Sequence, residues 1–181
     1  MKKPKRTSLT SRKSSVTNAM VHSIIYVEDI VGANYSDWLA RFNQKENNEK
    51  CIYCGSSANS FDHIFNLVRN GSPTGYMTEK NNLVPCCSNC NSKKSGKNWE
   101  DFIESDYFKS FAGWEKRHDF LRRVIEQYQP LKIDFKVDMP NEFDEFQKLR
   151  SKLLEQMDEI ERALNEIRKK VNNQYRSKIG N

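Results

Sequence analysis

Four cysteines, arranged as two pairs with two residues between the members of each pair, constrain this chain more than any other feature. Cys51 and Cys54 form the first pair, and Cys87 and Cys90 form the second. Two cysteines at this spacing can place their thiolates along one edge of a tetrahedral ion, and the second pair can supply the opposite edge. In a cytosolic protein such pairs are more often metal ligands than disulfides. The sequence therefore predicts a closed four-cysteine Zn²⁺ site that holds structure and leaves no position open for chemistry.

The stretch between the two pairs must contain structure of its own. Residues 55–86 separate the pairs, whereas a plain zinc ribbon has only about 15–20 residues there. Residues 61–65 alternate in the manner of a short strand, and residues 82–86 read as a second strand. A helix is expected to start at the second cysteine pair, with Asn91 near its beginning. We therefore predict a strand, a second strand and a helix, held at both ends by zinc.

The order of motifs in this stretch resembles that of the HNH nucleases. It reads Cys-x-x-Cys, Asp-His at residues 62–63, Asn-Leu at residues 82–83, Cys-x-x-Cys-Asn ending at Asn91, and then Lys-Lys. The resemblance covers roughly residues 50–105. It implies an α+β fold class, in which a small zinc-stapled ββα-metal core is flanked by helices. It also implies a metal-dependent enzyme that hydrolyses phosphodiester bonds in DNA.

The resemblance gives each motif residue a role. Asp62 and Asn91 would hold a catalytic divalent ion, His63 would be the general base, and Asn82 would brace the hairpin and the histidine. The chemistry of the side chains agrees, because a histidine accepts a proton from water near neutral pH. Carboxylate and amide oxygens are hard ligands that suit Mg²⁺ or Mn²⁺.

Some residues depart from the family pattern or lie outside it. Asn91 stands where many relatives have histidine, and Asn66 stands where many have proline. Asp62 and His63 are neighbours, so a regular strand would point them to opposite faces, and a twist or bulge is expected there. His22 and His118 fit no ligand spacing and are expected at the surface or partly buried.

Positive charge is concentrated at the N-terminus. The net charge of the chain is +6, and residues 1–19 contain six basic residues and no acidic ones. We expect these residues to form a disordered basic arm that neutralises phosphates, or else a solvated tail without a partner. The candidate nucleic-acid contacts are Lys2, Lys3, Lys5 and Arg6 of the arm and Arg69, Lys93, Lys94 and Lys97 of the cysteine-bounded module. A solvated basic helix face is the alternative for the module's lysines.

The rest of the chain divides into four further segments. We expect a helical N-terminal segment at residues 20–48, the zinc-bound nuclease module at 49–105, a helical or extended segment at 106–138, and a long C-terminal helix at 139–181. From Phe143 to Val171 the apolar residues follow a heptad pattern that only Arg150 interrupts. This pattern predicts either a homodimer paired through residues 143–171 or a long helix folded back on its own domain.

The sequence predicts a metal-dependent endonuclease that acts on double-stranded DNA, and a sequence-specific restriction-type enzyme is favoured. A phage or mobile-element nuclease that nicks one strand is one alternative, and a zinc nucleic-acid-binding module without catalysis is another. The presence of Asp62, His63 and Asn91 together argues against the binding module, which does not need all three. A scaffold protein would leave the central motif without a purpose. The chain has no run of about 18 apolar residues and no signal peptide, so we expect no membrane association and a cytoplasmic location.

Overall fold

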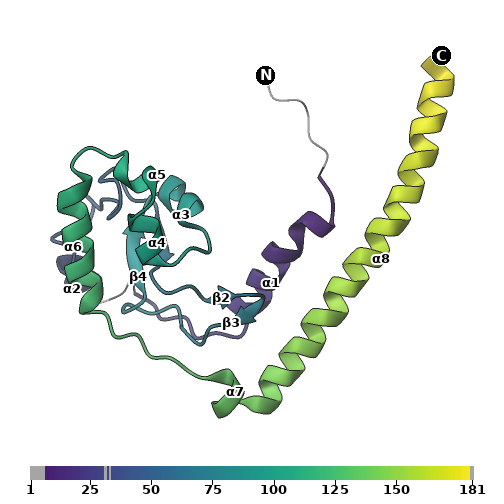
Figure 1. Ribbon diagram of the computed structural model, residues 1–181. Coiled ribbons are helices and arrows are strands. Elements are labelled where there is room, and N and C mark those ends of the chain that lie inside the picture. The colour runs from purple at the N-terminus through teal and green to yellow at the C-terminus, as the bar shows by residue number, and fades with distance from the viewer. Residues whose placement is uncertain (1–6, 31, 33, 180–181) are drawn as a thin grey trace.

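The computed structural model describes residues 7–30, 32 and 34–179, and consists of a small body and one long helix (Figure 1). The described elements are, in chain order, η1 (Thr10–Arg12), α1 (Lys13–His22), α2 (Tyr35–Ala40), β1 (Ser60–His63), β2 (Val68–Arg69), β3 (Ser72–Pro73), β4 (Leu83–Cys86), α3 (Ser88–Lys94), α4 (Trp99–Ile103), α5 (Asp106–Lys109), α6 (Trp114–Glu126), α7 (Phe135–Asp138) and α8 (Pro140–Ile179). Short two-stranded sheets among these helices confirm the α+β class.

A short antiparallel hairpin lies at the centre of the body. Strands β1 and β4 pair so that Asp62 lies opposite Val84 and His63 lies opposite Leu83. Helix α3 follows β4 directly and packs against β1. The predicted order of strand, strand and helix is therefore confirmed, although β1 ends at His63 rather than at residue 65. The loop between the strands carries a second small hairpin, formed by β2 and β3.

Two apolar clusters hold the molecule together. The larger one surrounds the hairpin and joins α2, α4, α5 and α6 to it; its large members include Trp38, Tyr53, Phe102, Phe108 and Leu121. The smaller one consists of Val21, Ile25, Leu67, Met77, Phe135 and Phe146. Since these residues come from α1, the segment that follows it, the hairpin loop, α7 and α8, the smaller cluster fixes the two terminal helices to the side of the hairpin loop.

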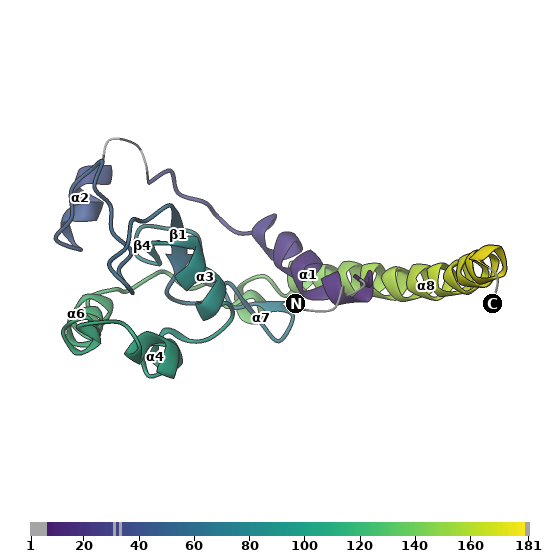
Figure 2. The same ribbon diagram turned by 90° about the horizontal axis from the view of Figure 1, so that it is seen from above.

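The expectation of a disordered arm at residues 1–19 is wrong for its second half. Residues 10–12 form η1, and α1 begins at Lys13 and lies alongside the first part of α8 in both views (Figures 1 and 2). Contacts to α8 explain the order: Thr17 and Val21 are buried, and the Lys13 ammonium lies 2.6 Å from the Asp158 carboxylate. The arm cannot fold by itself, but α8 supplies the surface that its composition lacks. Lys2, Lys3, Lys5 and Arg6 lie outside the described residues.

The segment at residues 20–48 is less helical than expected. After α1 the chain runs without a helix until α2, and Val27 forms a parallel bridge with Thr78. The backbone N–H of Glu28 donates to the Thr78 carbonyl oxygen at 2.8 Å, and the N–H of Thr78 donates to the Tyr26 carbonyl oxygen at 3.1 Å. Of the apolar residues between α1 and α2, Ile25 and Ile30 are buried, whereas Ile24, Tyr26 and Val27 are exposed. This stretch runs beside residues 77–79 and does not form a helix.

The heptad pattern on α8 has a first part with buried residues and a second part whose apolar residues are exposed. Phe146 and Met157 are buried, and Arg150, the residue that interrupts the heptads, donates from its Nε to the Thr17 hydroxyl at 3.3 Å. The first part of the pattern therefore folds back on the chain itself. Leu164, Ile167 and Val171 further along the helix are 46%, 57% and 58% exposed.

Among the described residues, none of the helices combines the length and the apolar character that a membrane span requires.

Candidate active site

The four cysteines come together at the base of the hairpin. The sulfur atoms of Cys51, Cys54, Cys87 and Cys90 all lie within 4.8 Å of one another. Gly55 turns the chain after the first pair with a φ of 78°, a conformation that favours glycine, and its N–H donates to the Cys51 carbonyl oxygen at 2.8 Å. Cys87 caps the start of α3, since its sulfur accepts from the Cys90 N–H. Four convergent thiols fit a structural Zn²⁺ ion.

A polar pocket of about 240 Å³ opens at the end of β1. Asp62 and His63 of β1 and Asn91 of α3 all border it, so the structure brings these three sequence-predicted residues together. Two residues from α1, Asn18 and His22, also border it. Asp62 and His63 thus reach one pocket although they are neighbours, because the pocket lies at the end of β1, where His63 is the last residue of the strand.

The Asp62 carboxylate is held from two sides. The Tyr53 hydroxyl donates to Asp62 Oδ2 at 2.6 Å, and burial together with the nearby Asp62 carboxylate raises the pKa of Tyr53, which keeps that proton in place. The Lys94 ammonium lies 3.3 Å from Oδ2 and 3.4 Å from Oδ1. Burial raises the pKa of Asp62, while the charge of Lys94 opposes that shift. Tyr53 and Lys94 therefore fix the carboxylate in position.

The structure contradicts the expected phosphate contact at Lys94. Its side chain is completely buried, and its ammonium donates to the His63 carbonyl oxygen at 2.7 Å as well as contacting Asp62. Lys94 shares the inner face of α3 with Cys90 and Asn91, which lie four and three residues before it on the same side of the helix. The exposed positions are those of Lys93, Lys97 and Arg69, and these three remain candidates for phosphate contacts.

His63 lies in a setting that favours its neutral form. Its Nε2 is 2.9 Å from the Thr78 hydroxyl oxygen, and its ring centroid is 5.9 Å from that of His22. Burial lowers the pKa of His63 to about 4, and the positive charges of His22 and Lys94 act in the same direction. A histidine that is neutral near pH 7 can accept a proton from water.

The two asparagines of the motif make different contacts. Asn82 is completely buried; its side chain accepts from the Phe65 N–H at 2.8 Å and donates to the carbonyl oxygens of Phe65 and Met77 at 3.0 and 2.9 Å. These bonds tie both ends of the hairpin loop together. Asn91 donates from its Nδ2 to the Phe61 carbonyl oxygen at 3.0 Å, so its amide oxygen is the atom available to a metal ion.

The residues present fit a divalent ion. Asp62 and Asn91 both border the pocket and both offer oxygen atoms, which hard cations prefer. An ionised carboxylate has about four lone-pair sites, so the Tyr53 and Lys94 contacts to Asp62 still leave room for an ion.

Sequence reasoning missed His22. Nothing in its spacing marks it as a site residue, and it lies well before the cysteine-bounded stretch, which begins at Cys51. Its place at the pocket results from the packing of α1 against α8, which a reading of local patterns does not include. His118, by contrast, lies away from the pocket and contacts Glu104, with 2.7 Å between Nε2 and the carboxylate oxygen.

A comparison with protein families agrees with the geometry. Residues 51–97 match the family model of the HNH endonuclease. No curated protein and no solved structure matches the chain. The matched stretch contains both cysteine pairs, Asp62, His63, Asn82 and Asn91, whereas α1 and α8 lie outside it. The chain therefore carries an HNH endonuclease domain at residues 51–97, as the order of its motifs predicted.

Proposed function

We propose that this protein is a metal-dependent endonuclease that cleaves double-stranded DNA at the pocket bordered by Asp62, His63 and Asn91. The observation that carries the proposal is the meeting of these three side chains at one polar pocket inside the HNH domain. An HNH domain implies a nucleic-acid substrate and nuclease activity in general. The choice of DNA and the roles of single residues are our inference from the chemistry of the pocket.

In the proposed mechanism, His63 is the general base and takes a proton from the attacking water. Its lowered pKa supports this role, because the ring is then neutral near pH 7 and can accept a proton. Asp62 and Asn91 would hold Mg²⁺ or Mn²⁺, and such an ion would supply stabilisation of the negative charge that develops on the phosphate and the departing 3′ oxygen. Asn82 positions the hairpin loop, and a Zn²⁺ ion at the four cysteines maintains the fold.

We include His22 in the site as a contact to the phosphate. It borders the pocket from α1, its ring lies 5.9 Å from that of His63, and it is exposed to solvent. An imidazole has an N–H donor in either of its neutral tautomers as well as when charged, so it can donate to a phosphate oxygen. Lys93, Lys97 and Arg69, all exposed, would hold the flanking backbone.

A restriction-type enzyme remains our preferred form of this activity. The exposed second half of the heptad pattern on α8 supports a homodimer paired through residues 143–171, and a symmetric dimer can cut both strands of a palindromic site. The alternatives are a phage or mobile-element HNH nuclease that nicks one strand and a module that binds nucleic acid without cutting it.

A plasmid cleavage assay tests the proposal. Supercoiled plasmid is incubated with the full chain and Mg²⁺ or Mn²⁺, and the control omits the divalent ion, because a strong chelator would also remove the structural zinc. Discrete linear fragments that require the added ion support the restriction-type enzyme, and nicked circles support the nicking alternative. Binding of DNA without cleavage under either ion would contradict nuclease activity and leave the inactive binding module.

A further inference from the structure

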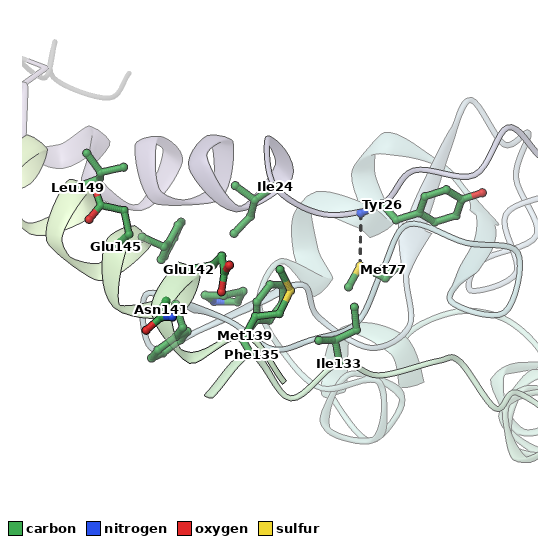
Figure 3. Close-up of a pocket in the computed structure, with 13 residues that line it drawn as sticks. Ile24, Tyr26, Met77, Ile133, Phe135, Met139, Asn141, Glu142, Glu145 and Leu149 are labelled. Atoms are coloured by element: carbon green, nitrogen blue, oxygen red, sulfur yellow. Dashed lines mark hydrogen bonds between the residues drawn. The ribbon is translucent and has the colours of Figure 1, made fainter. Parts of the chain in front are cut away.

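An apolar groove of about 650 Å³ lies between the start of α8, α7 and the segment that follows α1 (Figure 3). Apolar side chains from distant parts of the chain form its walls, among them Ile24, Met77, Phe135, Met139, Phe146 and Leu149. Three of these, Ile24, Met139 and Leu149, are 47%, 37% and 52% exposed. Glu142 and Glu145, both exposed, contribute negative charge to its lining. The groove is separate from the polar pocket of the HNH domain, since the two share no lining residue.

An exposed apolar stripe continues from this groove along α8. It begins at Leu149, which also lines the groove, and its members recur every three, four or seven residues on one side of the helix; they are Leu149, Leu153, Ile160, Leu164, Ile167, Val171, Tyr175 and Ile179. Their exposure ranges from 36% at Leu153 to 65% at Tyr175. The far half of α8 extends beyond α1, as both views show (Figures 1 and 2). A stripe of this kind is the surface by which helices pair.

Charge is distributed unequally between the two ends of α8. From residue 140 to residue 147 the helix carries three acidic residues, Glu142, Asp144 and Glu145, and no basic ones. From residue 168 to residue 179 it carries five basic residues and no acidic ones; the five are Arg168, Lys169, Lys170, Arg176 and Lys178. A parallel pair of α8 helices would place each cluster against its own copy, whereas an antiparallel pair places acidic against basic.

We propose that the groove is occupied by the C-terminal end of α8 from a second copy of this chain, in an antiparallel pair of α8 helices. A two-fold axis near Ile160 pairs the apolar stripes of the two helices, places the end of each helix at the groove of the other copy, and sets acidic residues opposite basic ones. Residues equally far from Ile160 then face each other, so Leu153 meets Ile167 of the second copy and Leu149 meets Val171. Tyr175 and Ile179 of the second copy reach the groove, and its Arg176 and Lys178 lie opposite Asp144 and Glu142.

The symmetry of this pair accounts for two exposed apolar surfaces at once, the groove at the start of α8 and the stripe on its C-terminal half. Helix α8 is about 60 Å long at about 1.5 Å per residue, with the groove at its start and the bare stripe at its end. In an antiparallel pair each bare end covers the groove of the other copy, so one self-complementary contact buries both surfaces. This pairing does not depend on the nuclease activity, and its test uses no cleavage.

Charge reversal combined with sedimentation velocity tests the orientation. One variant carries Arg176→Glu and Lys178→Glu, a second carries Glu142→Lys and Asp144→Lys, and a third carries all four changes. All four positions are exposed, so the fold is expected to survive, and zinc content and circular dichroism check this. For an antiparallel dimer, each double variant weakens dimerisation by about tenfold or more, because like charges then face each other, and the fourfold variant restores it.

Other outcomes overturn the proposal. In a parallel dimer each charged cluster faces the same cluster of the second copy, so like charges face each other in the wild type and in both double variants. Neither double variant would then weaken dimerisation, and the fourfold variant would have no loss to restore. A wild-type chain that stays monomeric at all concentrations, or variants that lose DNA binding without any change in oligomeric state, would also overturn it. A second pair of variants tests the groove: Ile179→Asp is expected to weaken the dimer, and Leu131→Asp, an exposed position outside both the groove and α8, is expected to leave it unchanged. Equal effects of these two substitutions on dimerisation would show that the second copy does not bind in the groove.

Discussion

The Asp62 carboxylate is held by neighbouring side chains on one side and borders the pocket on the other. On its inner side the carboxylate accepts from Tyr53 and contacts the buried ammonium of Lys94, and on its outer side it borders the pocket. A buried carboxylate without a partner would be costly, and the ammonium of Lys94 offsets part of that cost. The residue that we propose as a metal ligand is thereby held in one position before any ion binds.

For His22, which borders the pocket from outside the HNH domain, we expect His22→Ala to slow DNA cleavage by roughly 10- to 100-fold. A hydrogen bond to a charged group contributes about 1.5–3 kcal/mol, which corresponds to that range of rates. The measurement is the single-turnover cleavage rate, with zinc content as a check of the fold. His118→Ala is the matched control, because His118 lies away from the pocket, next to Glu104. Equal rates for the two variants and the wild type would remove His22 from the site.

The pH dependence of stability tests a different residue, Glu104. Contacts from His118, Lys109 and Arg122 lower the pKa of Glu104 to about 2 from its usual 4.5, with His118 as the largest cause. Because the folded pKa is depressed, this contribution to stability is present above about pH 4.5 and is lost as the pH falls toward 2. The difference in unfolding free energy between wild type and Glu104→Gln, measured by urea titration, should therefore shrink over this window. A difference that is constant from about pH 6 to about pH 2.5 would contradict the assignment.

At the scale of elements, the HNH hairpin is too short to be stable alone. Strands β1 and β4 have four residues each, and an isolated two-stranded hairpin is marginal in water. The four cysteines lie just outside the hairpin, in the turn before β1 and at the start of α3, so a bound Zn²⁺ ion would tie the start of the domain to its helix. Metal binding at such a site adds directly to folding free energy.

We therefore expect Cys54→Ser to lose stoichiometric zinc and the cooperative unfolding of the domain. Zinc content by elemental analysis and thermal unfolding by circular dichroism measure the two effects. Cys86→Ala is the matched control: Cys86 is a buried cysteine of β4 that lies outside the four-cysteine cluster, so this variant should keep its zinc. Zinc retained at wild-type level in Cys54→Ser would show that Cys54 is not a ligand.

The elements also show what the sequence allowed us to predict. The hairpin and α3 were predictable because strand alternation and cysteine spacing are local patterns, and Asp62, His63, Asn82 and Asn91 followed from the order of the motifs. Helix α1 was not predictable from its own composition, because the burial of Thr17 and Val21 depends on α8, far away in the sequence. The position of His22 and the ion pair of Lys94 were missed for the same reason: both depend on tertiary packing.

At the scale of the whole molecule, α1 and α8 attach the HNH domain to a long helical extension. The smaller apolar cluster joins α1, α7 and α8 to the hairpin loop, so the wall of the pocket that carries His22 is fixed to the base of α8. An element that lies outside the HNH domain thus contributes to the pocket of the domain.

The basic residues before η1 give a prediction at this scale. Deleting residues 2–6 removes Lys2, Lys3, Lys5 and Arg6 but leaves η1 and α1 intact. If these residues bind phosphates, DNA affinity falls, and the slope of log K against log salt concentration decreases by about 0.9 for each phosphate that the shortened chain no longer neutralises. Fluorescence anisotropy at several salt concentrations measures the slope. The same slope with and without these residues would assign them no role in binding.

We propose that the HNH pocket cleaves DNA through His63. The most direct measurement is the single-turnover cleavage rate of His63→Ala beside wild type, with Mg²⁺ or Mn²⁺, at matched zinc content and matched DNA binding. Loss of a general base is expected to lower the rate by about 10²–10⁴-fold while zinc content and DNA binding stay near wild type. A His63→Ala variant that cuts DNA at a rate close to that of the wild type would show that His63 is not the general base.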